Sequence, residues 1–211
     1  GFSGMRGIGR SSRGSRRGGS NDIFSGSLGG LGGWAVGGTP RILPLGLARK
    51  LPAGADIVLN SHFHPSGKEE DEQTTIGLYF ADKKPERTLI GFQVPPIFGS
   101  ISGLDIPAGE SNVRHDGYYR LKENAHIIAF QAHMHNLGKW QCLSAIYPDN
   151  TKAVLNCADW DFGWHIVYNY EDDVAPLLPK GTLLHVTSWH DNSDANRWND
   201  DPRNWAGFGQ R

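Results

Sequence analysis

Two pairs of histidines with the spacing His-x-His point most directly to chemistry in this chain, because imidazole is a common metal ligand. The pairs are His62 with His64 and His133 with His135, among nine histidines in 211 residues. In a β-strand, side chains at positions i and i+2 point to the same face and lie about 7 Å apart at the backbone. Each pair ends a predicted strand, so its two imidazoles are expected to converge on one metal ion.

The donor atoms restrict the identity of this metal. Imidazole nitrogen without a cysteine partner suits copper, zinc, iron or nickel better than the hard cations. The zinc-hydrolase motif His-Glu-x-x-His is absent. Residues 136–139, Asn-Leu-Gly-Lys, contain no carboxylate of the kind that follows the His-x-His of a cupin. Histidines of a half-buried strand that bind nothing are the alternative.

The strand that leads to the second pair is expected to span residues 126–135. Its even-numbered residues from Ile128 to Met134 share the face that is expected to pack in the core. His133 and His135 share the opposite face. Met134 therefore points away from any ion between the two histidines and is not expected to be a ligand.

Short apolar runs broken by Pro and Gly fill the chain from residue 40 onward, and their β-branched and aromatic residues indicate strands. No amphipathic stretch of helical length lies between residues 40 and 211. The pattern predicts an all-β chain with the architecture of a jelly-roll β-sandwich. The expected strands include residues 57–59, 75–80, 126–130, 142–147, 153–155 and 183–186.

An apolar-Pro-x-Gly sequence recurs at residues 51–54, 106–109 and 178–181. Proline at the second position and glycine at the fourth suit a type I turn. Internal duplication and independent convergence on one turn chemistry both explain the recurrence. Either explanation agrees with an all-β architecture.

Residues 1–38 are rich in Gly, Ser and Arg and are predicted to be a flexible low-complexity segment, because they offer little apolar surface to offset the entropy of ordering. An RNA- or phosphate-binding arm is the alternative. The whole chain has 21 basic and 22 acidic residues, a net charge of -1, which favours no nucleic-acid partner. No apolar run approaches the ~20 residues that a membrane span needs.

The two cysteines, Cys142 and Cys157, flank a predicted hairpin whose turn lies at residues 148–151. They are equally distant from the centre of the turn and are therefore expected to lie opposite each other. A disulfide and a pair of free, buried thiols are both compatible with this placement.

Residues 133–139, His-Met-His-Asn-Leu-Gly-Lys, resemble the His-x-His-x-Leu-Gly-Lys motif of the ascorbate-dependent type II copper monooxygenases, which include the peptidylglycine and dopamine hydroxylases. Residues 59–68, followed by 76–80, are similar to the second anchor of that family. The resemblance covers roughly residues 34–211. Segments 34–41, 159–164 and 190–193 share further residues with bacterial relatives.

The resemblance implies two jelly-roll domains with a cleft between them. Residues 39–102 correspond to the C-terminal part of the first domain, which holds the electron-transfer copper. Residues 103–211 correspond to the second domain, which holds the oxygen-activating copper. The metal ligands that the resemblance implies are His62, with His64 as an adjacent extra histidine, and the catalytic pair His133 and His135.

The family hydroxylates an activated C–H bond of a small molecule or peptide with O₂. It uses two copper ions and ascorbate or another one-electron donor. The resemblance implies that this donor can also be a protein or a further domain. The resemblance further implies an extracellular or periplasmic protein. No His-His pair precedes His62, and no methionine follows residue 205, although the family uses both as ligands. We therefore expect a chain truncated at both ends and inactive by itself.

Two other functions remain open. One is a non-catalytic β-sandwich module that binds a metal or a partner. The other is a mononuclear zinc or iron enzyme that uses His133, His135 and a third ligand such as His190.

Overall fold

The computed structural model describes residues 3–8, 30–40, 42–61, 63, 66–91, 94 and 103–207. Within these residues the chain forms thirteen strands and no helix, and thus no helix that could span a membrane. The predicted all-β class is confirmed for this part of the chain. Two compact units are present, Gly1–Ala35 with Thr39–Gln93 and Val36–Gly38 with Val94–Arg211.

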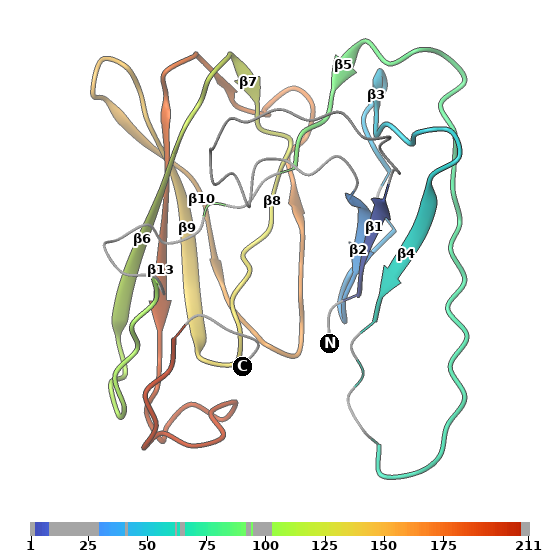
Figure 1. Ribbon diagram of the computed structural model, residues 1–211. Coiled ribbons are helices and arrows are strands. Elements are labelled where there is room, and N and C mark those ends of the chain that lie inside the picture. Colours follow the sequence, from blue (N-terminus) through green and yellow to red (C-terminus); the bar gives the residue numbers. More distant parts are fainter. Residues whose placement is uncertain are drawn as a thin grey trace, which may run out of the picture. The chain divides into compact units, whose positions relative to one another are not determined.

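The first unit contains a three-stranded antiparallel sheet in the order β2-β1-β4 (Figure 1). Strand β1 spans Ser3–Ile8, β2 spans Gly30–Trp34 and β4 spans Asp56–Asn60. Strands β1 and β2 lie in the segment 1–38, whose flexibility stays a prediction. Backbone hydrogen bonds, which need no apolar side chain, pair β1 on both of its sides. Residues 9–29 lie outside the described residues.

The strand predicted over residues 75–80 is not formed. Residues 66–86 contain no strand, and Tyr79 and Phe80 are exposed. β-Propensity alone does not make a strand, because a strand needs a partner for its backbone hydrogen bonds. In the same unit the two-residue strands β3 (Leu47–Ala48) and β5 (Arg87–Thr88) form a short parallel pair.

The second unit contains a four-stranded antiparallel sheet in the order β10-β9-β13-β6, whose strands lie side by side in Figure 1. Two short antiparallel pairs, β7 with β12 and β8 with β11, complete its strands. The bounds are β6 Val113–Arg120, β7 Ala125–His126, β8 Ala129–Phe130, β9 Gly138–Ile146, β10 Lys152–Asp159, β11 Tyr168–Asn169, β12 Leu177–Leu178 and β13 Leu183–His190. The predicted strands at 142–147, 153–155 and 183–186 fall on β9, β10 and β13.

The core of this unit forms between the four-stranded sheet and the short strand pairs. Consecutive residues are buried in the middle of β9 and β13, so both faces of these strands are covered there, and their apolar side chains alternate with polar ones. The apolar side chains pack in one cluster with side chains from β8 and β12. Two layers of antiparallel strands around one apolar core are consistent with a β-sandwich. The cluster includes Phe130, Leu143, Ala145, Leu178, Leu184 and Val186.

The hairpin between β9 and β10 joins the two cysteines. Its loop is closed by a 2.8 Å hydrogen bond from the Tyr147 N–H to the Thr151 carbonyl, and Asn150 adopts a left-handed φ of 67°. A bulge between Val154 and Asn156 then shifts the register by one residue. Cys142 consequently faces Cys157, with a Cα–Cα distance of 4.1 Å, and the two form a disulfide. The predicted opposition of the cysteines is confirmed, and the thiols are not free.

The three Pro-x-Gly turns share one geometry, which differs from the predicted one. In each, the proline carbonyl accepts a hydrogen bond from the residue three positions later, at 3.2, 3.4 and 3.2 Å. Proline is therefore the first residue of the turn and glycine the third. The three glycines, Gly54, Gly109 and Gly181, have φ values of 72°, 76° and 91°. A positive φ at the third position is the requirement of a type II turn, so the type I prediction is wrong.

Candidate metal centre

His133 and His135 lie in the irregular segment between β8 and β9, and not at the end of a continuous strand. The predicted strand 126–135 is broken into β7 and β8, each only two residues long, and no strand continues beyond Phe130. The alternation of faces nevertheless persists. Met134 is buried, whereas His133 is exposed and His135 is half-buried. Met134 thus lies on the core side, as predicted.

The two imidazoles lie close together on the outer side of this segment. Their ring centroids are 5.3 Å apart and their planes are inclined by 77°. The backbone N–H of His133 donates to Gln141 Oε1 at 3.3 Å, and Gln141 Nε2 donates to Ser188 Oγ at 2.7 Å. Side chains of β9 and β13 therefore fix the segment that carries the pair.

Trp160, which directly follows β10, supports the same segment beside the start of β9. Its Nε1–H donates to the carbonyl of His135 at 2.8 Å, and its ring meets that of His133 edge-on at 6.0 Å. Gly138 makes this approach possible. A Cβ at position 138 would overlap Met134 Cβ and lie 2.5 Å from Trp160 Cδ1.

His165 is a third imidazole near the pair, and no sequence motif marks it. It is buried, with 3% of its surface exposed, and its ring meets Trp160 edge-on at 4.6 Å. Its Nε2 lies 2.8 Å from the Phe162 carbonyl. Desolvation by the surrounding protein atoms, followed by the nearby imidazoles of His135 and His165, lowers the pKa of His133 to about 4, although part of the residue's surface is exposed. His133 is therefore neutral at pH 7, which is the form that binds metals.

His190, the third ligand of the zinc or iron alternative, lies at the end of β13 and is buried. Its nearest imidazole is that of His115, with the two Nδ1 atoms 3.2 Å apart. Among the described residues, no three His, Cys, Asp or Glu side chains converge on a point where they could hold one ion. The structure therefore does not bring His190 together with His133 and His135 as one ligand set.

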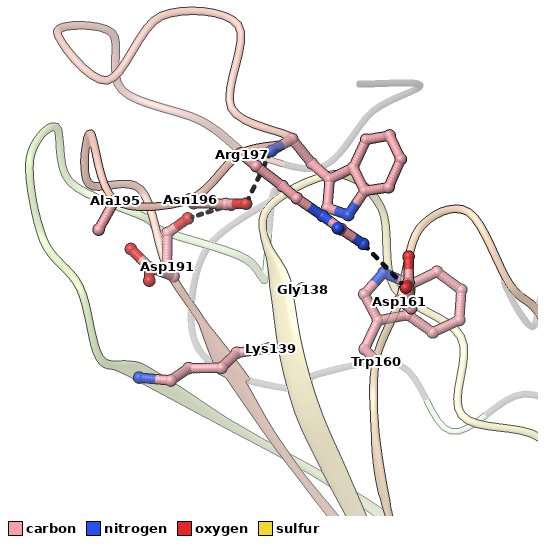
Figure 2. Close-up of a pocket in the computed structure, with 9 residues that line it drawn as sticks. Gly138, Lys139, Trp160, Asp161, Asp191, Ala195, Asn196 and Arg197 are labelled. Atoms are coloured by element: carbon pink, nitrogen blue, oxygen red, sulfur yellow. Dashed lines mark hydrogen bonds and ion pairs between the residues drawn. The ribbon is translucent and has the colours of Figure 1, made fainter.

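A polar pocket of about 260 Å³ lies beside Trp160. Figure 2 shows Arg197 reaching from the loop after β13 to Asp161, where its Nη2 lies 3.0 Å from the carboxylate. The guanidinium also lies over the ring of Trp198, 4.8 Å from its centroid. Trp160 thus lines the pocket and contacts His133. The lining residues are Gly138, Lys139, Trp160, Asp161, Asp191, Ala195, Asn196, Arg197 and Trp198.

His62 and His64, the predicted ligands of the electron-transfer copper, lie outside the described residues. No known protein family, curated protein or solved structure matches the chain. The chemistry of this centre is therefore inferred from its own residues.

Proposed function

We propose that His133 and His135 bind one copper ion, and that the chain is a copper-binding part of a monooxygenase that hydroxylates an activated C–H bond. The observation that carries the proposal is the placement of two imidazoles side by side, opposite a buried Met134, in a sequence that resembles the copper monooxygenase motif. The resemblance also suggests two jelly-roll domains, residues 39–102 and 103–211.

The geometry of the pair fits a shared ion. Two imidazoles bound to one ion at metal–nitrogen distances of about 2.0–2.1 Å have ring centroids roughly 5 Å apart at a tetrahedral angle. The centroids of His133 and His135 are 5.3 Å apart. Imidazole suits copper, and copper when bound supplies the one-electron redox chemistry that O₂ activation requires.

In this proposal the residues around His133 and His135 orient the ligands and bind the substrate. Trp160 holds the carbonyl of His135 and covers one edge of His133, so it orients both ligands. The adjacent pocket presents Lys139 and Arg197 together with Asp161 and Asp191, and this mixture of charges suits the polar part of a small-molecule or peptide substrate. His62, with His64 beside it, is proposed for the electron-transfer copper, with ascorbate or another one-electron donor as reductant.

An extracellular or periplasmic location accompanies the proposal. The Cys142–Cys157 disulfide supports it, because disulfides persist in oxidising compartments and are rare in the cytosol.

The experiment is a Cu²⁺ titration of the full chain after passage over a chelating resin, with the bound copper counted and its EPR spectrum recorded. The variant His133→Ala/His135→Ala is expected to bind one copper fewer than the wild type. His126→Ala is the matched control, because His126 is an exposed histidine on β7 of the same unit. An unchanged copper count in the double variant would show that the pair is not a copper site.

A non-catalytic metal-binding module is the second candidate, because no third side-chain ligand converges with His133 and His135 among the described residues. Ascorbate-driven O₂ consumption with matching product formation separates the two when it is measured on a full-length version of the protein that has bound copper. Copper binding without coupled O₂ consumption and product formation, whichever substrate is supplied, would favour the non-catalytic module.

A further inference from the structure

A second pair of histidines, separate from His133 and His135, lies between neighbouring strands of the four-stranded sheet. His115 is in β6 and His190 ends β13. In the antiparallel register His190 faces Val113 and His115 faces Ser188, so the two histidines are diagonal neighbours on one face of the sheet. They are 75 residues apart in the sequence.

The distance between the two rings is that of ligands on one ion. The Nδ1 atoms of His115 and His190 are 3.2 Å apart, and the ring centroids are 5.0 Å apart with planes inclined by 81°. Two nitrogens bound to one ion at about 2.0–2.1 Å lie roughly 3.3 Å apart at a tetrahedral angle, and the ring centroids then lie roughly 5 Å apart. An ion can therefore replace the proton that the two Nδ1 atoms share, with little movement of either strand.

The other contacts of the rings also resemble those of metal ligands. Nε2 of His115 lies 3.1 Å from both the backbone N–H and the carbonyl of Asp105, and a ligating histidine usually donates its second N–H to an acceptor such as this carbonyl. His190 forms a hydrogen bond with the backbone of Val113. Burial lowers the pKa of both rings, that of His190 to about 4.

We propose that Nδ1 of His115 and Nδ1 of His190 are ligands in a second metal site, which takes a late first-row divalent cation such as Cu²⁺ or Zn²⁺. Water completes the coordination, because only two side-chain ligands meet there. An ion in this site would link the end of β13 to β6 and, through the contact of His115, to the chain segment at Asp105. The site does not depend on the copper proposed for His133 and His135.

The test counts metal ions bound to the full chain in titrations with Zn²⁺ and with Cu²⁺. We expect His115→Ala/His190→Ala to bind one ion fewer than the wild type and His126→Ala. His133→Ala/His135→Ala is also expected to bind one ion fewer, and the variant with all four substitutions two fewer. Circular dichroism checks that each variant is folded.

The outcomes separate the two sites. An ion count in His115→Ala/His190→Ala equal to that of the wild type overturns the second site, whereas an unchanged count in His133→Ala/His135→Ala overturns only the copper proposal. Loss of all metal in either double variant means that the four histidines share one site, which also overturns a separate second site.

If a variant does not fold, a measurement on the wild type still tests the proposal. Zn²⁺ is expected to shift the imidazole ¹⁵N signals of both His115 and His190. Signals that stay unshifted at saturating Zn²⁺ would contradict the proposal.

Discussion

At the scale of single residues, the candidate copper pair depends on a glycine. Gly138 begins β9 directly after the segment that carries His133 and His135. Its missing Cβ lets the indole of Trp160 approach the backbone closely enough to hold the His135 carbonyl. Its φ is not in the left-handed region, so the requirement for glycine here is one of space alone.

We predict that Gly138→Ala lowers the free energy of unfolding by about 1–3 kcal/mol, the usual cost of overpacking a filled site. The substitution is also expected to weaken Cu²⁺ binding, because Trp160 must move away from His135. Gly32→Ala is the control, since no atom lies within 4 Å of a Cβ at position 32. Chemical denaturation and a Cu²⁺ titration check both effects, and equal values for the two variants would contradict the role of Gly138.

At the scale of elements, the hairpin β9–β10 shows how a local irregularity determines a covalent bond. The turn pairs Ile146 with Lys152, and that register alone would place Cys157 opposite Gln141. The bulge after Val154 adds one residue to β10 and brings Cys157 opposite Cys142. The disulfide therefore depends on the bulge as much as on the turn.

We predict that Cys142→Ser/Cys157→Ser lowers the free energy of unfolding by about 3 kcal/mol, the value expected for a bond that closes a loop of this length. The sequence separation of the cysteines is 15 residues. Reducing agent is expected to destabilise the wild type to the same extent and to leave the serine variant unchanged, which makes that variant its own control. A wild type whose urea midpoint is unaffected by full reduction would contradict this account.

At the scale of the whole molecule, the chain has two units, and each needs residues that are distant in the sequence. The first unit uses β1 as the central strand between β2 and β4. Val36–Gly38 belongs to the second unit, where the Val36 carbonyl accepts a 2.7 Å hydrogen bond from the N–H of His165. Segments near the start of the chain therefore take part in both units.

We predict that deletion of residues 1–9 destabilises the first unit, because it removes the hydrogen-bond partner on one side of β2 and of β4. Amide exchange at Ile57, Val58 and Leu59 is expected to become faster, while exchange in β9 and β13 stays unchanged. Deletion of residues 69–73, an exposed segment without strands, is the control. Unchanged exchange in β4 after loss of residues 1–9 would show that β1 is dispensable.

The sequence by itself determined the features that depend on near neighbours. Alternation along residues 128–135 separates Met134 from His133 and His135 even where no strand forms, because successive side chains of an extended chain point in opposite directions. Turn residues between two apolar runs were sufficient to predict the hairpin, whereas the opposition of Cys142 and Cys157 also depends on the bulge after Val154. The copper function of the histidine pair stays a prediction.

Only the tertiary structure decided which distant segments meet. The Nδ1 contact between His115 and His190 arises from the pairing of β6 with β13, and the position of His165 arises from the packing of Trp160. Strand β1 likewise depends on distant segments, because its Gly-rich sequence resembles a flexible segment and its hydrogen-bond partners are β2 and β4. Residues 75–80 have the composition of a strand, but no other described segment pairs with them. Backbone pairing is a property of two segments, and neither segment alone specifies the other.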